Sequence, residues 1–334
     1  MSEPLRIGLL GAARITPDAV VGPAHELGHR LVAVAARDEE RARDFAAEHG
    51  VERVVADYDA LLADPEVDLV YNPLANGLHG RWNVAALRAG KDVLTEKPSA
   101  ADAAEARAVH DVARETGRAL LEGFHHAHHP LWLRVHEILA AGELGGLVSV
   151  EAVMHMPAPD DDDPRWSAEL AGGSVMDVGC YALHAVRDLA AHVEGGHAIP
   201  VVLSARGEER FPGVDGWLDA DLDLGGGVSG RIRSSMVAPD VDFRLEVVGE
   251  RGSLSAPCFI KPQLDDRLLV RVDGAERVEH LGARTSYTYQ LAAVAAHLND
   301  GVPFRTDAAD AVVAMELVDA CYTAAGMAPR RPTT

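Results

Sequence analysis

The sequence predicts an α/β protein: a doubly wound parallel sheet, then an α+β domain with a large open, mostly antiparallel sheet. From residue 5 to about 125, short apolar runs alternate with amphipathic segments, as in repeated βα units whose strands are covered on both faces. After residue 200, period-two patterns separated by glycine turns indicate antiparallel strands. At 334 residues the chain is long enough for two cores, and we expect domains at residues 1–124 and 125–334.

The expected strands of the first domain cover residues 7–10, 31–35, 53–55, 67–71, 92–95 and 119–122. A helix begins at Pro17, and helical segments at 38–49, 81–88 and 101–116 each close on or near a glycine, which favours helix termination. In the second domain we expect helices at 131–141, 174–191, 287–299 and 308–325, and strands at 148–156, 201–206, 217–224, 228–237, 243–248 and 268–272.

Composition and charge exclude several classes of protein. No run approaches the roughly 20 apolar residues of a membrane span, and the N-terminus lacks the pattern of a secretory signal. Three widely separated cysteines fit a reducing compartment better than a disulfide scaffold. A formal charge of -21 argues against binding nucleic acid through its phosphates. We therefore expect a soluble, cytoplasmic protein without a nucleic-acid or membrane partner.

The first apolar run feeds a glycine turn at Gly11, directly before the helix that begins at Pro17. Free backbone N–H groups and the helix dipole favour an anion at such a corner, so a dinucleotide pyrophosphate would bind here. Ala13 and Thr16 stand at the second and third positions of the G-x-G-x-x-G fingerprint. The incomplete match makes this motif alone weak evidence.

Arg37 and Asp38 follow the second strand, where a dinucleotide fold recognises the adenine ribose. An arginine here can pair with a 2′-phosphate, which favours NADP over NAD. The alternative is that both residues only open a solvated helix, with Asp38 near its N-terminus. Arg14 could help to hold the phosphates or merely cover the sheet edge.

The fourth and fifth strands end on the rim where open α/β sheets bind ligands. Asn72, Asn76 and His79 could contact the nicotinamide half of a cofactor; equally, the asparagines could be turn residues and His79 the start of a helix. Lys97 precedes Pro98, which fixes the backbone and lets the ammonium group be aimed. The alternative for Lys97 is a lone exposed lysine.

In the second half, Asp177, Tyr181 and His184 are spaced at i, i+4 and i+7, on one face of the expected helix. An acid, a phenol and an imidazole on a buried face are costly unless they are hydrogen-bonded or take part in chemistry. They therefore form either a functional site or a structural polar cluster.

These motifs resemble the Gfo/Idh/MocA family of glucose-fructose oxidoreductase and inositol dehydrogenase, over nearly the full length of the chain. The matching segments are residues 8–15, 35–38, 76–79, 96–98 (Glu-Lys-Pro) and 177–181. Tyr181 stands where the inositol dehydrogenase branch usually has histidine. Together with Arg165 and Trp166, it resembles the branch of glucose-fructose oxidoreductase, dihydrodiol dehydrogenase and NADP-linked xylose dehydrogenases.

The resemblance implies an oxidoreductase with a Rossmann domain, in which Lys97 and Tyr181 form the catalytic pair. Tyr181 would exchange the substrate hydroxyl proton, and the lysine would favour the ionised phenol and steady the developing alkoxide. The other expected substrate contacts are Asp177, His184, His125, His126 and Trp166. The expected cofactor contacts are Gly11, Ala12, Ala13, Arg14, Ile15, Arg37, Asn72, Pro73, Asn76, His79, Glu96 and Lys97.

Residues 125–129 depart from the family pattern, because Ala127 stands where relatives in this branch often have arginine. Four histidines in five positions suggest metal ligation, but no acid or cysteine is interleaved and the family reaction needs no metal, so we expect none. The acidic run 160–163 is expected to be a mobile solvated loop or, alternatively, a lid.

The sequence thus predicts an NADP(H)-dependent dehydrogenase or reductase, with NAD(H) as the alternative cofactor, acting on a sugar or cyclic diol. Two rivals remain: a non-catalytic, cofactor-sensing regulator, and a glycoside-cleaving member that oxidises its substrate transiently. The second domain would bind the substrate. The resemblance also implies a homodimer or a higher homo-oligomer, formed through the open sheet.

Overall fold

The computed structural model describes residues 3–333, which divide into two compact units. Unit 1 contains residues up to His125 together with Tyr287–Val312 and the segment from Pro332, and unit 2 contains His126–Ser286 and Val313–Arg331. The expected boundary after residue 124 lies next to the first crossing between the units. The units differ from the expectation because residues 287–312 pack with the N-terminal part of the chain.

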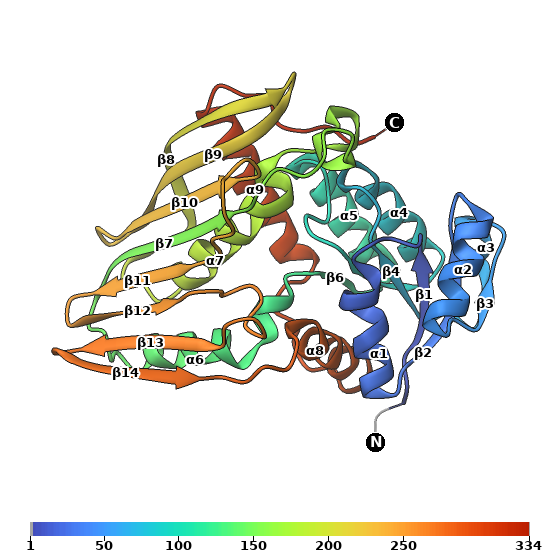
Figure 1. Cartoon of the computed structure of the whole chain (residues 1–334), viewed down its shortest axis with the longest axis horizontal. Coiled ribbons are helices and arrows are strands. Elements are labelled where there is room, and N and C mark those ends of the chain that lie inside the picture. The colour runs from blue at the N-terminus through green and yellow to red at the C-terminus, as the bar shows by residue number, and fades with distance from the viewer. Residues whose placement is uncertain (1–2, 334) are drawn as a thin grey trace. The chain divides into compact units, whose positions relative to one another are not determined.

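Unit 1 is built on a six-stranded parallel sheet with the strand order β3-β2-β1-β4-β5-β6 (Figure 1). All six strands fall where apolar runs predict them. Their bounds are β1 Arg6–Leu10, β2 Arg30–Ala35, β3 Arg53–Val54, β4 Leu69–Asn72, β5 Asp92–Thr95 and β6 Leu120–Glu122. The order reverses between β1 and β4, so this doubly wound sheet has the topological switch point at which such folds bind nucleotides.

Both faces of this sheet are covered, which is why its strands are apolar without alternation. One face packs against α1 (Gly22–Leu27) and α8 (Ser286–Asp300), where Leu291 and Val294 are fully buried in the same core as Ile7. The other packs against α3 (Tyr58–Ala63), α4 (Asn76–Arg88) and α5 (Ala103–Thr116). Helix α2 spans Glu39–His49.

Unit 2 is built on an eight-stranded sheet with the order β14-β13-β12-β11-β7-β10-β9-β8. The sheet is mostly antiparallel, as predicted; its one parallel contact joins β7 and β10. The strand bounds are β7 Leu147–His155, β8 Gly196–Phe211, β9 Val214–Gly225, β10 Ser229–Ser235, β11 Leu245–Gly249, β12 Gly252–Ala256, β13 Arg267–Val272 and β14 Ala275–His280.

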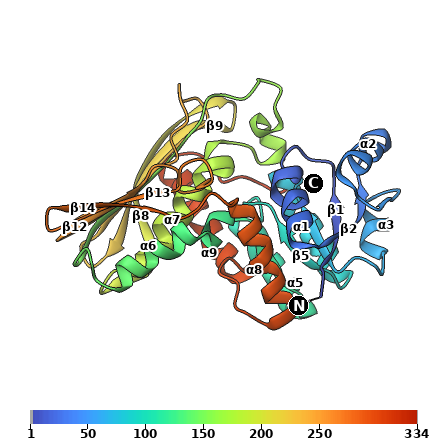
Figure 2. The same ribbon diagram turned by 60° about the horizontal axis from the view of Figure 1, so that its bottom comes forward.

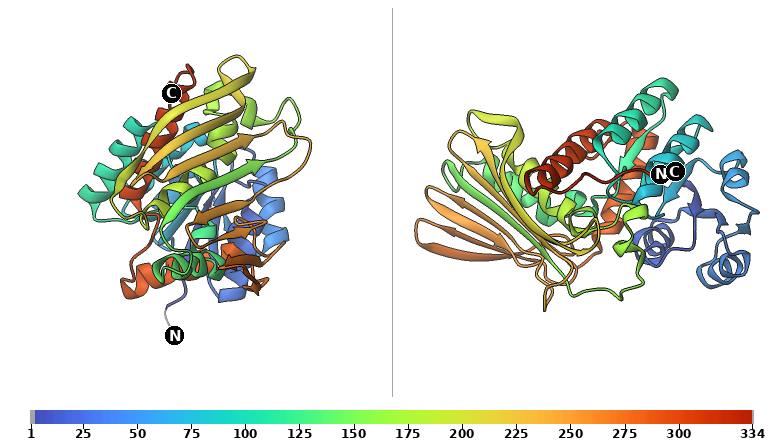
Figure 3. Two further views of the ribbon diagram at one scale, coloured as in Figure 1. Left: turned by 90° about the vertical axis from the view of Figure 1, so that its left-hand side faces the viewer. Right: turned by 90° about the horizontal axis from the view of Figure 1, so that it is seen from above.

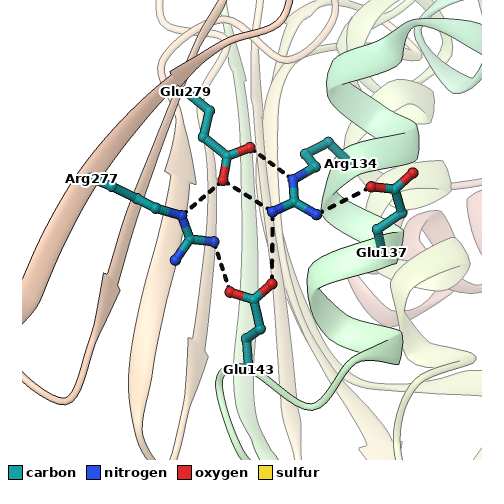
Figure 4. A network of polar contacts seen from close by, with 5 residues as sticks. All are labelled: Arg134, Glu137, Glu143, Arg277 and Glu279. Carbon is teal, nitrogen blue, oxygen red and sulfur yellow. Dashed lines mark hydrogen bonds and ion pairs between the residues drawn. The ribbon is translucent and has the colours of Figure 1, made fainter.

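Helices pack on one face of this sheet and leave the other open (Figures 2 and 3). Helix α7 (Cys180–Ala190) lies against β7, β8 and β10. Helix α6 (Pro130–Ala140) is joined to β14 by an ion-pair network of five residues: Arg134, Glu137, Glu143, Arg277 and Glu279 (Figure 4). Helix α9 spans Ala308–Ala324. No helix within residues 3–333 is long and apolar enough to cross a membrane.

Candidate active site

The glycine turn has the geometry that a nucleotide site requires. Gly11 has φ +90° and donates a hydrogen bond of 2.7 Å to the carbonyl oxygen of Ala35. A Cβ on Gly11 would lie 3.3 Å from Leu74 and strain the backbone, so the position is suited to glycine. The chain then enters a π-helical turn, η1 (Pro17–Val21), which continues into α1. The backbone of this turn therefore fits the pyrophosphate of a dinucleotide.

Two arginines follow β2: Arg37 lies in the loop after the strand, and Arg41 lies on α2. Arg37 is exposed, and Asp38 caps α2 by accepting a 3.1 Å hydrogen bond from the backbone N–H of Arg41. The Arg41 side chain reaches back to the glycine turn and donates a 2.5 Å hydrogen bond to the carbonyl oxygen of Ala12. Burial raises the pKa of the nearby Tyr58 phenol, and the charges of Arg37 and Arg41 oppose that shift. Arg41 was not among the residues expected from the sequence, where its only signal is its position three residues after the capping aspartate.

The loop after β4 is tied together by its own side chains. Asn72 is fully buried and donates to Asn83 Oδ1 at 2.8 Å and to the His79 carbonyl oxygen at 3.3 Å. Pro73 is buried, and Asn76 begins α4, half-buried. The side chain of Asn72 thus serves as a structural link inside this loop.

His79 connects this loop to the Glu-Lys-Pro turn. Its Nδ1 lies 2.6 Å from the carbonyl oxygen of Pro98 and its Nε2 lies 2.7 Å from that of Leu74. Burial lowers its pKa to about 4, although both carbonyl contacts favour the charged ring. A neutral imidazole has one N–H, so the ring donates to one of these two carbonyl oxygens at a time while it contacts both loops.

Lys97 lies half-buried between two anchored neighbours. Glu96 is 8% exposed and accepts a 2.9 Å hydrogen bond from the buried Tyr71 hydroxyl. The Lys97–Pro98 peptide bond is cis, and the next backbone N–H, that of Ser99, donates to Glu122 Oε1 at 2.7 Å. The backbone on both sides of Lys97 is therefore fixed, as the adjacent proline suggested.

In unit 2, Asp177, Tyr181 and His184 are helical, as predicted. Asp177 belongs to a second π-helical turn, η5 (Val175–Gly179), and the other two lie on α7. Tyr181 and His184 are 5% and 2% exposed, whereas the Asp177 side chain is 19% exposed. π-helical turns within helices are frequent at functional sites.

His126 lies in an aromatic cluster that includes Tyr181. The His126 ring makes edge contacts with Trp132, Tyr181, His184 and Phe259, at centroid distances of 4.9 to 5.7 Å. Burial lowers the pKa of His126 to about 3 and that of His184 well below its ordinary value. Burial therefore favours the neutral form of both rings. His125 belongs to unit 1, where it stacks on Tyr287 at 4.0 Å.

Arg165, in the segment before Gly172 and Gly173, lies next to two aspartates. Arg165 pairs with Asp163 at 2.9 Å and lies 3.5 Å from Asp177, so it faces the carboxylate of the predicted substrate contact. Trp166 is buried beneath the guanidinium of Arg210, which in turn pairs with Asp161 at 2.6 Å. Two aspartates of the acidic run thus hold structural contacts.

The structure brings the expected cofactor residues together within unit 1 and most of the expected substrate residues together within unit 2. Lys97 and Tyr181 belong to different units, so their pairing stays a prediction. Among residues 3–333, no group of three or more histidine, cysteine or carboxylate side chains is arranged to hold a metal ion.

Family models match both halves of the chain. Residues 5–124 match the oxidoreductase family with an NAD-binding Rossmann fold, and residues 132–255 match the GFO/IDH/MocA C-terminal domain. A D-xylose 1-dehydrogenase (NADP(+)) of Haloferax volcanii is 35% identical over 96% of this chain and 97% of its own length. The chain belongs to the Gfo/Idh/MocA family. The predicted family, fold class and oxidoreductase activity are thereby confirmed.

Other Gfo/Idh/MocA relatives differ in the substrates that their names record. A dTDP-3,4-didehydro-2,6-dideoxy-alpha-D-glucose 3-reductase of Streptomyces violaceoruber is 34% identical, over 96% of this chain and 95% of its own. The crystal structure of KijD10, a 3-ketoreductase from Actinomadura kijaniata in complex with NADP and TDP-benzene, has a TM-score of 0.86. It is 29% identical and covers 96% of this chain and 98% of KijD10.

Proposed function

We propose that the protein is an NADP(H)-dependent oxidoreductase that transfers a hydride between nicotinamide and a carbinol or carbonyl carbon of a sugar or cyclic diol. The observation that carries this proposal is the retention of Lys97, held in the anchored Glu-Lys-Pro turn, together with Tyr181 on the helix that follows the π-helical turn. Relatives named as NADP-linked dehydrogenases and reductases support the cofactor and the substrate class.

In this proposal, bound NADP⁺ would supply the acceptor for the hydride of the carbinol carbon, and Tyr181, as the phenolate, would take the proton of the same hydroxyl. The Lys97 ammonium favours the ionised phenol and stabilises the developing alkoxide. Asp177, oriented by Arg165, hydrogen-bonds a neighbouring hydroxyl. The backbone of residues 11–15, with the loops of Asn72, Asn76 and Glu96, would hold the dinucleotide, and Arg37 would hold its 2′-phosphate.

Structures of KijD10 variants in complex with TDP-benzene and NADP give further support. One variant has a tyrosine changed to phenylalanine and another a lysine changed to alanine. The altered lysine and tyrosine are 84 residues apart, the same separation as between Lys97 and Tyr181.

The test is a panel of aldoses, nucleotide-linked sugars, inositols and diols, monitored for NADPH at 340 nm, with Lys97→Ala and Tyr181→Phe beside the wild type. We expect turnover with at least one polyol, and a loss of about 100-fold or more in kcat for both variants, with NADPH still bound. Purified protein that binds neither NADPH nor NADH in a fluorescence titration would refute the proposal. Tight binding without turnover would instead favour the regulator, and release of free sugar from a glycoside without net NADPH would favour the glycoside-cleaving alternative.

The open face of the eight-stranded sheet supports a homodimer. Exposed hydrophobic side chains lie on its strands, including Val201, Val248 and Val278 at 49%, 39% and 52% exposure. A second copy of the chain that packs on this face would cover these side chains. Light scattering during size-exclusion chromatography should give twice the mass of 35.5 kDa, and a monomer at micromolar concentration would contradict this assignment.

A further inference from the structure

A buried ion pair in unit 2 lies outside the proposed catalytic groups. Asp215 on β9 and Arg330 after α9 approach to 2.5 Å, with side-chain exposures of 0% and 5%. The Tyr322 hydroxyl donates a 2.9 Å hydrogen bond to the same carboxylate, and the Arg330 guanidinium lies 4.2 Å from the centroid of the Tyr322 ring. Both charges are thus removed from water and partnered on several sides.

This ion pair holds the backbone that leads into Asp177. The second oxygen of Asp215 accepts a 2.8 Å hydrogen bond from the N–H of Val175, the first residue of the π-helical turn. Arg330 Nε donates a 2.7 Å hydrogen bond to the carbonyl oxygen of Gly172. The two members of the pair therefore fix both ends of the short stretch 172–175.

Gly173, which lies inside this stretch, has no room for a side chain. Gly173 has φ +129°, and a Cβ there would overlap the Asp215 carboxylate. Ser174 is also fixed, because its hydroxyl lies 2.5 Å from that of Ser234 on β10. The start of the π-helical turn is thus held by side chains from β9, β10 and the segment after α9.

A buried ion pair is a poor source of net stability, because desolvation of the two charges offsets most of their attraction. What the pair does here is hold the backbone of Gly172 and Val175 in place. A π-helical turn departs from regular helical hydrogen bonding, so its direction depends on the contacts at its ends. Asp177 lies two residues after Val175, and Tyr181 lies on the first turn of α7, so an error in the direction of this turn moves both side chains.

We propose that Asp215 and Arg330 are positioning residues for hydride transfer, which act by fixing the stretch 172–175 and thereby the placement of Asp177 and Tyr181. The inference rests on the proposed function of Tyr181. A displacement of about 1 Å in a reacting group lowers rates by up to about 100-fold, so loss of this anchor is expected to slow the chemical step itself.

The test uses Arg330→Met, Arg330→Lys and Asp215→Asn in single-turnover stopped-flow assays, with the substrate identified by the panel. The amplitude reports the fraction of folded enzyme, whereas the rate constant reports placement of the reacting groups. We expect rate constants lowered about 10- to 100-fold for Arg330→Met, with partial recovery in Arg330→Lys, and an unchanged Kd for NADPH. A loss of amplitude with a wild-type rate constant would overturn the inference.

Hydrogen exchange measured by mass spectrometry gives a readout that needs no substrate. In Arg330→Met, we expect faster exchange confined to peptides covering residues 172–182. Exchange that is unchanged there, or faster throughout unit 2, would contradict the positioning role. Arg134→Met is the control, because it removes an arginine ion pair from α6 and β14 at the opposite edge of the sheet (Figure 4); it should leave both the rate constant and this peptide unchanged.

Different results would refute the proposed function and this inference. If Lys97→Ala and Tyr181→Phe keep the wild-type rate constant, the proposed function is wrong. If these two variants are impaired but Arg330→Met and Asp215→Asn transfer hydride at the wild-type rate, only the positioning role is wrong.

Discussion

The imidazole of His79 lies 2.6 Å from the carbonyl oxygen of Pro98, and this contact connects the loop after β4 to the turn that carries Lys97. From the sequence, His79 was expected either to contact the cofactor or to stand at the start of a helix. The structure shows that it lies on α4 with both ring nitrogens placed against backbone carbonyl oxygens. His79 can therefore influence the placement of Lys97 through the backbone of Pro98.

Replacing His79 with leucine should impair turnover through Lys97. The change removes both carbonyl contacts, so the Glu-Lys-Pro turn loses an anchor and the ammonium group is aimed less well. We expect kcat to fall about 10-fold, with a smaller effect in His79→Asn, which retains one hydrogen-bonding group. Steady-state kinetics with NADP and the active sugar measure this. Wild-type kcat in both variants would show that the contact does not position Lys97.

The buried His126 should make folding stability fall as the pH is lowered. Its pKa of about 3 in the folded state lies below the ordinary value of 6.5, so the unfolded chain binds a proton first. Stability present above pH 6.5 is therefore lost between pH 6.5 and 3, by about 2 kcal/mol at pH 5. Urea unfolding at pH 7 and pH 5 should show a smaller loss in His126→Phe than in the wild type.

The control for this prediction is His25→Phe, which changes a histidine that is exposed in the folded protein. Its pH dependence should match that of the wild type. An equal loss of stability in wild type and His126→Phe would mean that His126 does not contribute to the acid sensitivity.

Periodicity predicted the six strands of unit 1 because both faces of that sheet are buried. The periodicity of apolar residues did not reveal elements that are short or largely exposed. Strand β14 is exposed or half-exposed along its whole length and shows no apolar pattern, and β12 alternates over only four residues, Ser-Leu-Ser-Ala, which is too short to stand out; both were missed. Helix α3 was missed as well, because a six-residue helix is too short to show a period.

For the candidate site, local motifs predicted which residues gather but not what holds them in place. Gly172 and Gly173 were visible in the sequence, but the reasons for them were not: a Cβ on Gly173 would overlap the Asp215 carboxylate, and one on Gly172 would overlap the carbonyl group of Arg165. Similarly, the partners of His79 are backbone carbonyl oxygens, which every residue has. Contacts of this kind leave no local signal, so they emerge only from the folded chain.

Arg37→Ala should weaken binding of NADP more than binding of NAD. An exposed guanidinium at the end of β2 would meet only the 2′-phosphate, and a charged hydrogen bond of this kind contributes about 1.5 to 3 kcal/mol. We therefore expect the ratio of the KM values, NADP over NAD, to rise about 10- to 100-fold. Arg41→Ala should weaken both cofactors, because its hydrogen bond goes to the glycine turn.

Arg43→Ala is the matched control for these two variants. Arg43 lies on the same helix and pairs with Glu39 on an exposed surface, so both KM values should stay at the wild-type level. If Arg37→Ala leaves the ratio of the KM values unchanged, the preference for NADP has another origin.

The ion-pair network of α6 and β14 should contribute a modest, pH-dependent stability. Arg134 contacts Glu279 at 2.7 Å and Glu137 at 3.1 Å, and Arg277 bridges Glu279 and Glu143 (Figure 4). The hydrogen bond from Arg134 lowers the pKa of Glu279 to about 2. Because these side chains are still partly solvated, we expect Arg134→Met to cost only about 1 kcal/mol, a shift of about 2 to 4 °C in Tm.

The pH dependence separates this ion-pair network from packing. The lowered pKa of Glu279 means that its contribution is present above pH 4.5 and is lost as the pH falls toward 2. The difference in Tm between wild type and Arg134→Met should therefore be full at pH 7 and shrink below pH 4.5; calorimetry across that range measures it. Arg251→Met, which breaks an exposed pair with Asp273, should leave Tm unchanged. A difference for Arg134→Met that persists at pH 2.5 would show that the arginine stabilises α6 by packing and not by charge.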